Sequence, residues 1–118
     1  MQALLTALLL AAAPAAGADS VAGFYVIDQM EMGGGLELRP DGSFRYALDY
    51  GAVSEQAEGK WTIDDGEVQL TTDPMPPKSE CDRGYASACF DRTPLVSEDG
   101  NLVLYRWDAK IRLQPRPR

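Results

Sequence analysis

The stretch LELRPDGSFRYALDY, residues 36–50, decides the fold class of this chain. Apolar and polar side chains alternate on both sides of a Pro-Asp-Gly-Ser turn, which is the pattern of two antiparallel strands with one buried face. Pro40 presets the backbone φ for the turn, and Gly42 readily adopts the positive φ that a tight reversal needs. The stretch therefore predicts a β-hairpin whose apolar face, after the turn, consists of Phe44, Tyr46, Leu48 and Tyr50.

The same turn chemistry recurs at Asp65-Gly66 and Asp99-Gly100, each between short alternating runs. Asp-Gly flanked by alternating apolar residues is the strongest short-range signal of a hairpin. No stretch of eleven or more residues after residue 18 has helical periodicity. The pattern predicts strands at 23–28, 36–39, 44–50, 59–63, 67–72, 93–97, 102–107 and 110–113.

The connections are less regular. We expect residues 30–35, which end in three glycines, to form a loop, and residues 51–58 to hold at most one helical turn. Residues 73–92 are poor in strand signals because prolines remove the N–H donors of a sheet ladder. In the second hairpin, the side chains expected to face the core are Trp61, Ile63, Val68 and Leu70.

Consecutive hairpins build an antiparallel meander, which must curl or fold over to bury its apolar face and its edges. The sequence therefore predicts an all-β domain, a small antiparallel meander barrel of about 7–8 strands. A two-layer β-sandwich is the alternative, because both architectures satisfy the same alternation.

The first residues have the composition of an export signal. An apolar run at 4–13, too short to span a bilayer, precedes the small residues 16–18. We expect a signal peptide at 1–18, a single domain at 19–113 and an extended basic tail at 114–118, in a periplasmic or secreted protein. Because no Lys or Arg precedes the apolar run, an uncleaved anchor and a misassigned start codon stay open. After cleavage we expect no stable membrane insertion, and no cysteine follows the run to carry a lipid.

The charge distribution restricts the partners. The formal net charge is −7, although five basic residues lie between positions 106 and 118. An acidic body repels nucleic acids and anionic membranes at long range. We therefore expect no nucleic-acid partner, and instead an unknown protein or a small apolar ligand of the cell envelope.

Cys81 and Cys89 are the only cysteines. An even count in an exported chain indicates a disulfide, and closing this short ring stabilises the folded state by about 2.5 kcal/mol on the chain-entropy model. The chain has no histidine and no second cysteine pair, so we expect no metal site and no cofactor. The redox motif C-x-x-C is also absent.

A family resemblance covers residues 21–77. It rests on Gly23-x-Tyr25, the Asp41-Gly42-x-Phe44-x-Tyr46 hairpin and Gly59-x-Trp61. In these motifs the chain resembles small exported bacterial lipocalin-like β-barrel domains and is similar to the N-terminal domain of copper-resistance lipoproteins, without its CxxC. The resemblance implies a compact meander barrel in the envelope. It does not carry over metal handling or lipid anchoring, because the cysteines for both are missing.

Catalytic motifs are scarce. Without histidine the commonest general base is missing, and we expect no enzyme. Glu55 and Glu58 are a possible acid and base pair for a hydrolase of another class. Acidic residues at 64, 65 and 67 are interpreted as turn residues rather than calcium ligands, and residues 33–35 lack the Lys and helix of a phosphate loop.

The sequence therefore favours a non-enzymatic binding or structural module of the envelope. Tyr46, Tyr50 and Trp61 are the candidate ligand-binding residues if they line a barrel cavity. In a barrel this small the favoured explanation is that they fill the core, because small barrels are occupied by their own side chains. A protease inhibitor that uses the 74–92 loop is an alternative, because a proline-flanked segment beside a disulfide is rigid. A carboxylate-based hydrolase is the alternative of another class.

Overall fold

The computed structural model describes residues 20–83 and 86–117, so the predicted signal peptide at 1–18 lies outside the described residues. The elements of the described part are, in chain order, β1 (Gly23–Gln29), β2 (Met32–Leu38), β3 (Ser43–Tyr50), β4 (Val53–Asp64), β5 (Glu67–Thr72), α2 (Lys78–Arg83), β6 (Ala86–Ser87), β7 (Thr93–Glu98), β8 (Asn101–Arg106) and β9 (Ala109–Pro115).

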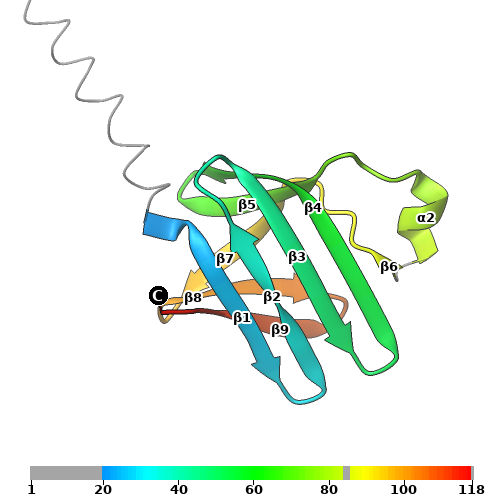
Figure 1. Cartoon of the computed structure of the whole chain (residues 1–118), viewed down its shortest axis with the longest axis horizontal. Coiled ribbons are helices and arrows are strands. Elements are labelled where there is room, and N and C mark those ends of the chain that lie inside the picture. Colours follow the sequence, from blue (N-terminus) through cyan, green and yellow to red (C-terminus); the bar gives the residue numbers. More distant parts are fainter. Residues whose placement is uncertain (1–19, 84–85, 118) are drawn as a thin grey trace, which may run out of the picture.

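Eight of these strands form a closed antiparallel meander barrel (Figure 1). Each strand pairs with the next along the chain, β5 with β7, and β9 returns to pair with β1. The remaining strand, β6, lies outside the barrel and pairs in parallel with β4. The predicted barrel is therefore confirmed, and the two-layer sandwich is wrong because pairing continues around the whole ring.

The three Asp-Gly turns lie at the same end of the barrel. They close the β2–β3, β4–β5 and β7–β8 hairpins, as predicted. In the last two, aspartate and glycine both have positive φ, at Asp65-Gly66 and Asp99-Gly100, as a type I′ turn requires. The opposite end carries the β1–β2, β3–β4 and β8–β9 turns.

Side chains alternate along the strands, and the apolar ones fill the barrel. Tyr46 and Leu48 of β3 are buried, whereas Arg45, Ala47 and Asp49 face solvent, as expected. The buried apolar cluster consists of Tyr25, Ile27, Leu36, Leu38, Phe44, Tyr46, Leu48, Trp61, Val68, Leu70, Ala88, Phe90, Leu95, Leu102, Leu104, Ile111 and Leu113. The aromatic residues Tyr46 and Trp61 thus belong to the core.

One predicted core residue is wrong. Ile63 is 38% exposed, because the pairing of β4 with β3 ends at Lys60 while the β4–β5 hairpin continues to Asp64. The end of this hairpin therefore extends past its neighbour, and Ile63 has no strand beside it on that side.

Two predicted loops are strands. Residues 33–35 belong to β2, and most of residues 51–58 belongs to the long β4 rather than to a helical turn. The glycines are needed for close packing of strands, since a Cβ at Gly34 would collide with the carbonyl oxygen of Ala47. In β4 the side chain of Glu55 points inward, and because it is charged, the first half of the strand does not show the alternation of apolar and polar residues.

Residues 73–92 are poor in strand, as predicted, and contain α2 and the two-residue β6. The predicted disulfide between Cys81 and Cys89 is present. The segment is fixed to the barrel at Thr72, whose hydroxyl donates to the carbonyl of Ala88 and accepts from the N–H of Phe90. As a result Phe90 enters the core, although α2 lies to one side of the barrel (Figure 1).

The barrel also extends beyond the expected boundary at residue 113. Gln114 and Pro115 are part of β9 and pair with β1, and the N–H of Arg116 donates to the carbonyl of Phe24. A proline fits here because β9 turns the N–H groups of alternate residues toward β1, and Pro115 stands between two such residues. Residues 114–116 therefore close the barrel instead of belonging to the extended tail that we expected.

Where β1 and β9 separate, a side chain replaces the backbone ladder. The amide of Gln29 donates to the carbonyl of Lys110 and accepts from the N–H of Arg112. This bridge holds the seam at the end of the barrel opposite the Asp-Gly turns.

Within residues 20–83 and 86–117, the structure has no helix that is both long enough and apolar enough to cross a bilayer.

We predict that Gly59→Ala lowers the free energy of unfolding by about 2 kcal/mol or more. A Cβ at Gly59 would collide with the carbonyl oxygen of Thr71 and lie 2.7 Å from the backbone nitrogen of Asp73, so the backbone of β5 must shift. Urea denaturation measures the change. Gly33→Ala is the matched control, because it lies in β2 with nothing within 4 Å of the added carbon. An equal loss in both variants would contradict the steric explanation.

Candidate functional site

A buried polar cluster occupies the barrel interior toward the end opposite the Asp-Gly turns. Glu55 of β4 accepts hydrogen bonds from the Tyr46 hydroxyl at 2.8 Å and from Arg106 Nε and Nη2, both at 2.7 Å. The Glu55 side chain is fully buried, and that of Arg106 is 19% exposed. The bidentate ion pair therefore joins β4 to β8 across the interior, and Tyr46 links β3 to it.

Aromatic rings enclose the guanidinium of this pair. The Arg106 Cζ atom lies 5.5 Å from the ring centroid of Phe90 and 4.8 Å from that of Trp107. Phe90 also meets Tyr46 edge to face, at 5.1 Å between centroids. Contacts of this kind stabilise a partly desolvated cation, and here one of them joins the Trp107 ring to Arg106.

The cluster is chemically saturated. Both carboxylate oxygens of Glu55 have partners, and no buried side-chain nitrogen or oxygen in the described part of the chain lacks one. Burial, followed by the charge of Glu55 and the hydrogen bond to it, raises the pKa of Tyr46 far above its usual range. The phenol therefore stays protonated at neutral pH as a donor to Glu55, and the arrangement has the character of a structural support.

A recess of about 410 Å³ opens at this end of the barrel. The residues that line it are Tyr50, Val53, Trp107, Asp108 and Ala109. The β3–β4 and β8–β9 hairpins position them, and the rings of Tyr50 and Trp107 lie 6.1 Å apart with a tilt of 34°. Because Trp107 also contacts Arg106, the recess lies directly beside the buried ion pair.

The backbone of Trp107 is unusual. The residue is the first of the two that turn β8 into β9, and its φ is +55°. The corresponding residue of the β3–β4 turn is Gly51, with a φ of +58°. A first turn residue with positive φ, followed by one with negative φ, is typical of a type II′ turn, where glycine is preferred and a bulky side chain is strained. A half-exposed tryptophan therefore occupies a glycine position.

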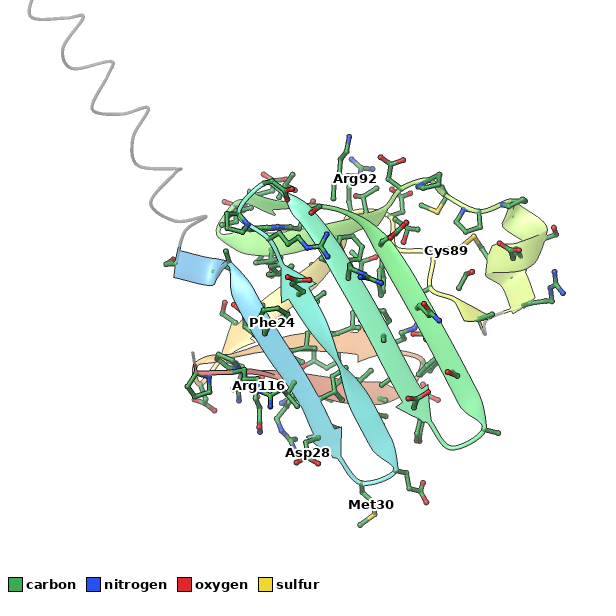
Figure 2. The ribbon with its side chains drawn as sticks, in the orientation of Figure 1. Phe24, Asp28, Met30, Cys89, Arg92 and Arg116 are labelled. Atoms are coloured by element: carbon green, nitrogen blue, oxygen red, sulfur yellow. A yellow bond between two sulfur atoms is a disulfide. The ribbon has the colours of Figure 1, made fainter. Side chains whose placement is uncertain are left out.

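A second recess, of about 700 Å³, lies on the outer face of β1–β4. Its floor is low because Gly35 pairs with Ala47, and Phe24 and Arg116 lie together at its edge (Figure 2). This recess is larger, and Pro74, Pro76 and residues 86–88 line it together with the sheet. Charged side chains of opposite sign, Glu37, Arg45 and Glu58, alternate across the strands that form its floor. We place the candidate site at the smaller recess, where a half-exposed tryptophan beside the partly buried Tyr50, a strained backbone and a buried ion pair coincide.

The structure does not bring the three predicted ligand-binding residues together. Tyr46 is buried in the ionic cluster, and Tyr50 lines the recess. Trp61 is buried at the other end of the barrel, where its Nε1 donates to the carbonyl of Arg39 at 2.8 Å. These three residues therefore do not line one common cavity.

Two important residues, Arg106 and Trp107, were missed by the sequence reasoning. The prediction placed both inside a strand at 102–107, whereas Trp107 begins a two-residue turn. A signal was present in the sequence. The predicted strands 102–107 and 110–113 follow each other closely without Gly or Asn between them, so another residue has to take the positive φ of the turn.

Glu55 and Glu58 lie on opposite faces of β4, one buried and one exposed. They therefore cannot converge on one substrate as an acid and base pair. In the part of the chain that the structure describes, no three acidic or cysteine side chains gather as metal ligands, including those at 64, 65 and 67. In the 74–92 loop, α2 begins at Lys78, and the short segment before it carries the 44% exposed Met75.

Comparisons with protein families, with curated proteins and with solved structures gave no significant match. The barrel fold is therefore established by the structure alone, and the likeness to lipocalin-like domains stays a resemblance of motifs.

We predict that Glu55→Leu lowers the free energy of unfolding by about 3–5 kcal/mol, because it leaves the Arg106 charge without its partner. The double variant Glu55→Leu, Arg106→Met should lose less free energy of unfolding than Glu55→Leu alone, since removing both charges also removes the cost of burying them. Chemical denaturation of the wild type, both single variants and the double variant gives the coupling. If the stability loss of the double variant equals the sum of the losses of Glu55→Leu and Arg106→Met, the two side chains are not coupled.

We predict that stability falls at alkaline pH and that Tyr46→Phe reduces this fall. The pKa of Tyr46 is raised in the folded state, so the phenol keeps its proton while the unfolded chain releases it above a pH of about 10. Below that pH the Tyr46 phenol makes its full contribution to the free energy of unfolding. Above it, this contribution falls by about 1.4 kcal/mol per pH unit. Urea midpoints at several alkaline pH values test this. Burial also raises the pKa of Tyr25, which is present in both proteins, and an unchanged slope in Tyr46→Phe would contradict the assignment.

Proposed function

We propose that this protein is an exported, non-enzymatic binding module, acting in the periplasm or outside the cell, that takes a small molecule at the barrel-end recess. The observation that carries the proposal is Trp107. Its side chain is 49% exposed, its φ is +55° and it lines the recess together with Tyr50.

The backbone strain supports a role in binding. Holding a bulky residue at positive φ costs about 1–2 kcal/mol, and glycine would avoid that cost. The chain does use glycine in the equivalent turn, at Gly51. A half-exposed Trp107 gains only part of the burial that would offset the strain, so its presence is better explained by an incoming ligand that covers the ring.

The rest of the site supports binding rather than catalysis. Glu55, Tyr46 and Arg106 satisfy each other, so none of them is a free base or nucleophile. Asp108 is the one carboxylate among the residues that line the recess, and the sequence has no histidine to act with it. The recess thus offers a contact surface and no acid and base pair.

The filled interior supports a shallow site. The apolar core and the buried ion pair occupy the barrel, and the side chain of Glu55 is fully buried. A ligand at this end therefore rests on Tyr50 and Trp107 and does not pass between the strands, unlike a molecule carried in a deep barrel cavity.

The two tryptophans make the proposal testable by fluorescence. Trp61 is buried and Trp107 is half exposed, so Trp61→Phe leaves a single reporter at the recess. We predict that at least one of four probe classes, neutral sugars, dodecanoate, choline and inorganic phosphate, produces a saturable change in the Trp107 emission. The matched variant Trp107→Phe, which keeps only Trp61, should give no response.

Trp107→Gly is the decisive control for affinity. It replaces the strained residue by the one that the turn prefers, so we expect its free energy of unfolding to stay within about 1 kcal/mol of the wild type while binding is lost. Calorimetric titration measures binding when the fluorophore is absent. If none of the four probe classes binds, or if Trp107→Gly binds equally well, the proposed function is wrong.

A further inference from the structure

We propose that the barrel-end recess binds the neutral pyranose ring of a carbohydrate, an assignment that rests on the binding role proposed above. The shape and charge of the recess argue for this ligand class in three steps.

The charges around the recess disfavour ionic ligands of either sign. Glu55 already neutralises Arg106 in a bidentate pair, so the guanidinium is a weak attractant for an anion. Asp108 lines the recess, and its carboxylate repels anions further. Asp108 attracts cations, but the Arg106 guanidinium already lies over the Trp107 ring, 4.8 Å from its centroid, and leaves less of the negative ring face for a second cation. The charges around the recess therefore favour a neutral ligand over an anion or a cation.

The lining residues combine an apolar surface with one strong acceptor. Tyr50, Trp107, Val53 and Ala109 provide rings and aliphatic carbon, and Asp108 provides a carboxylate. A pyranose has the matching chemistry, since one face exposes C–H groups that stack on an aromatic ring and its edge carries hydroxyl donors. The volume of about 410 Å³ lies within the range of small-molecule sites, roughly 300–1,000 Å³.

The aromatic platform is fixed before the ligand arrives. The turn restrains the backbone of Trp107, Arg106 packs against its ring, and Glu55 holds Arg106 through two hydrogen bonds. A rigid platform lowers the entropy lost on binding, which matters for a sugar because its hydroxyls must leave water. Glu55 therefore acts on the ligand only through Arg106 and Trp107, which lie between them.

A long apolar ligand does not fit this geometry. A fatty acyl chain needs a channel into the barrel, and the positions behind the recess are occupied by the buried cluster of Tyr46, Glu55 and Phe90. Only a compact, flat molecule can cover the rings of Tyr50 and Trp107 from outside.

The test uses the Trp61→Phe protein and a panel of neutral sugars: glucose, mannose, galactose, N-acetylglucosamine and their disaccharides. We expect a saturable change in Trp107 emission with at least one sugar, at millimolar concentration or below. Asp108→Ala should weaken that affinity about tenfold, the effect of one hydrogen bond to a charged group. Tyr105→Ala is the matched control, because this exposed aromatic residue of β8 does not line the recess and its loss should leave the affinity unchanged.

The probe panel separates the two levels of the proposal. If dodecanoate, choline or phosphate binds in a manner that depends on Trp107 and no sugar does, the carbohydrate assignment is overturned while the binding role stands. If no probe binds, both are wrong. If a sugar binds but Asp108→Ala and Tyr105→Ala behave alike, the ligand lies elsewhere on the barrel and the assignment of this recess is overturned.

Discussion

The ion pair between Glu55 and Arg106 is the constraint around which this barrel is arranged. A carboxylate in the middle of an apolar interior is tolerated only when every lone pair is matched, and here a guanidinium and a phenol provide the match. The consequences reach in two directions. Inward, the cluster fills the space that a ligand cavity would need, and outward, it fixes the guanidinium against which Trp107 packs. The interior chemistry therefore determines the geometry of the surface above it.

The two ends of the barrel have different characters. At one end, glycine takes the positive φ in every Asp-Gly hairpin, and the turns follow the rules of local sequence. At the other end, Gly51 follows those rules, whereas Glu31 (φ +64°) and Trp107 (φ +55°) are non-glycine residues at positive φ, and of these two Trp107 lines the recess. Residues that disagree with their backbone conformation persist in natural proteins mainly at sites of function. The strained Trp107 is therefore a stronger reason for choosing this recess than the volume of either recess.

Most of the architecture could be predicted from the sequence because hairpin signals are local. The Asp-Gly turns and the alternation after Gly42 required no knowledge of distant residues. What escaped prediction depended on partners far along the chain. The burial of Glu55 is explicable only through Arg106, which is remote in sequence, so β4 was not recognised in its first half. Likewise, Pro115 was assigned to the C-terminal tail, because only the structure shows that β1 lies beside it.

The candidate site was harder to predict than the fold for the same reason. Tyr50 was a candidate, yet its neighbour Trp107 lies far away in sequence and was assigned to a strand. Only the register of β8 with β9 shows that Trp107 begins a turn, and only the closed ring brings that turn to the β3–β4 hairpin. Local patterns therefore identified the aromatic residues but not their grouping.

The pairing of β1 with β9 also sets the order of folding. These are the first and last strands of the described chain, so the ring can be joined only when the final strand has been delivered. Every hairpin can form early from neighbouring residues, yet closure brings together segments separated by almost the whole domain, which makes it the slow and late step. While the chain is being synthesised, this barrel would therefore remain an open sheet with unprotected edges until β9 is complete.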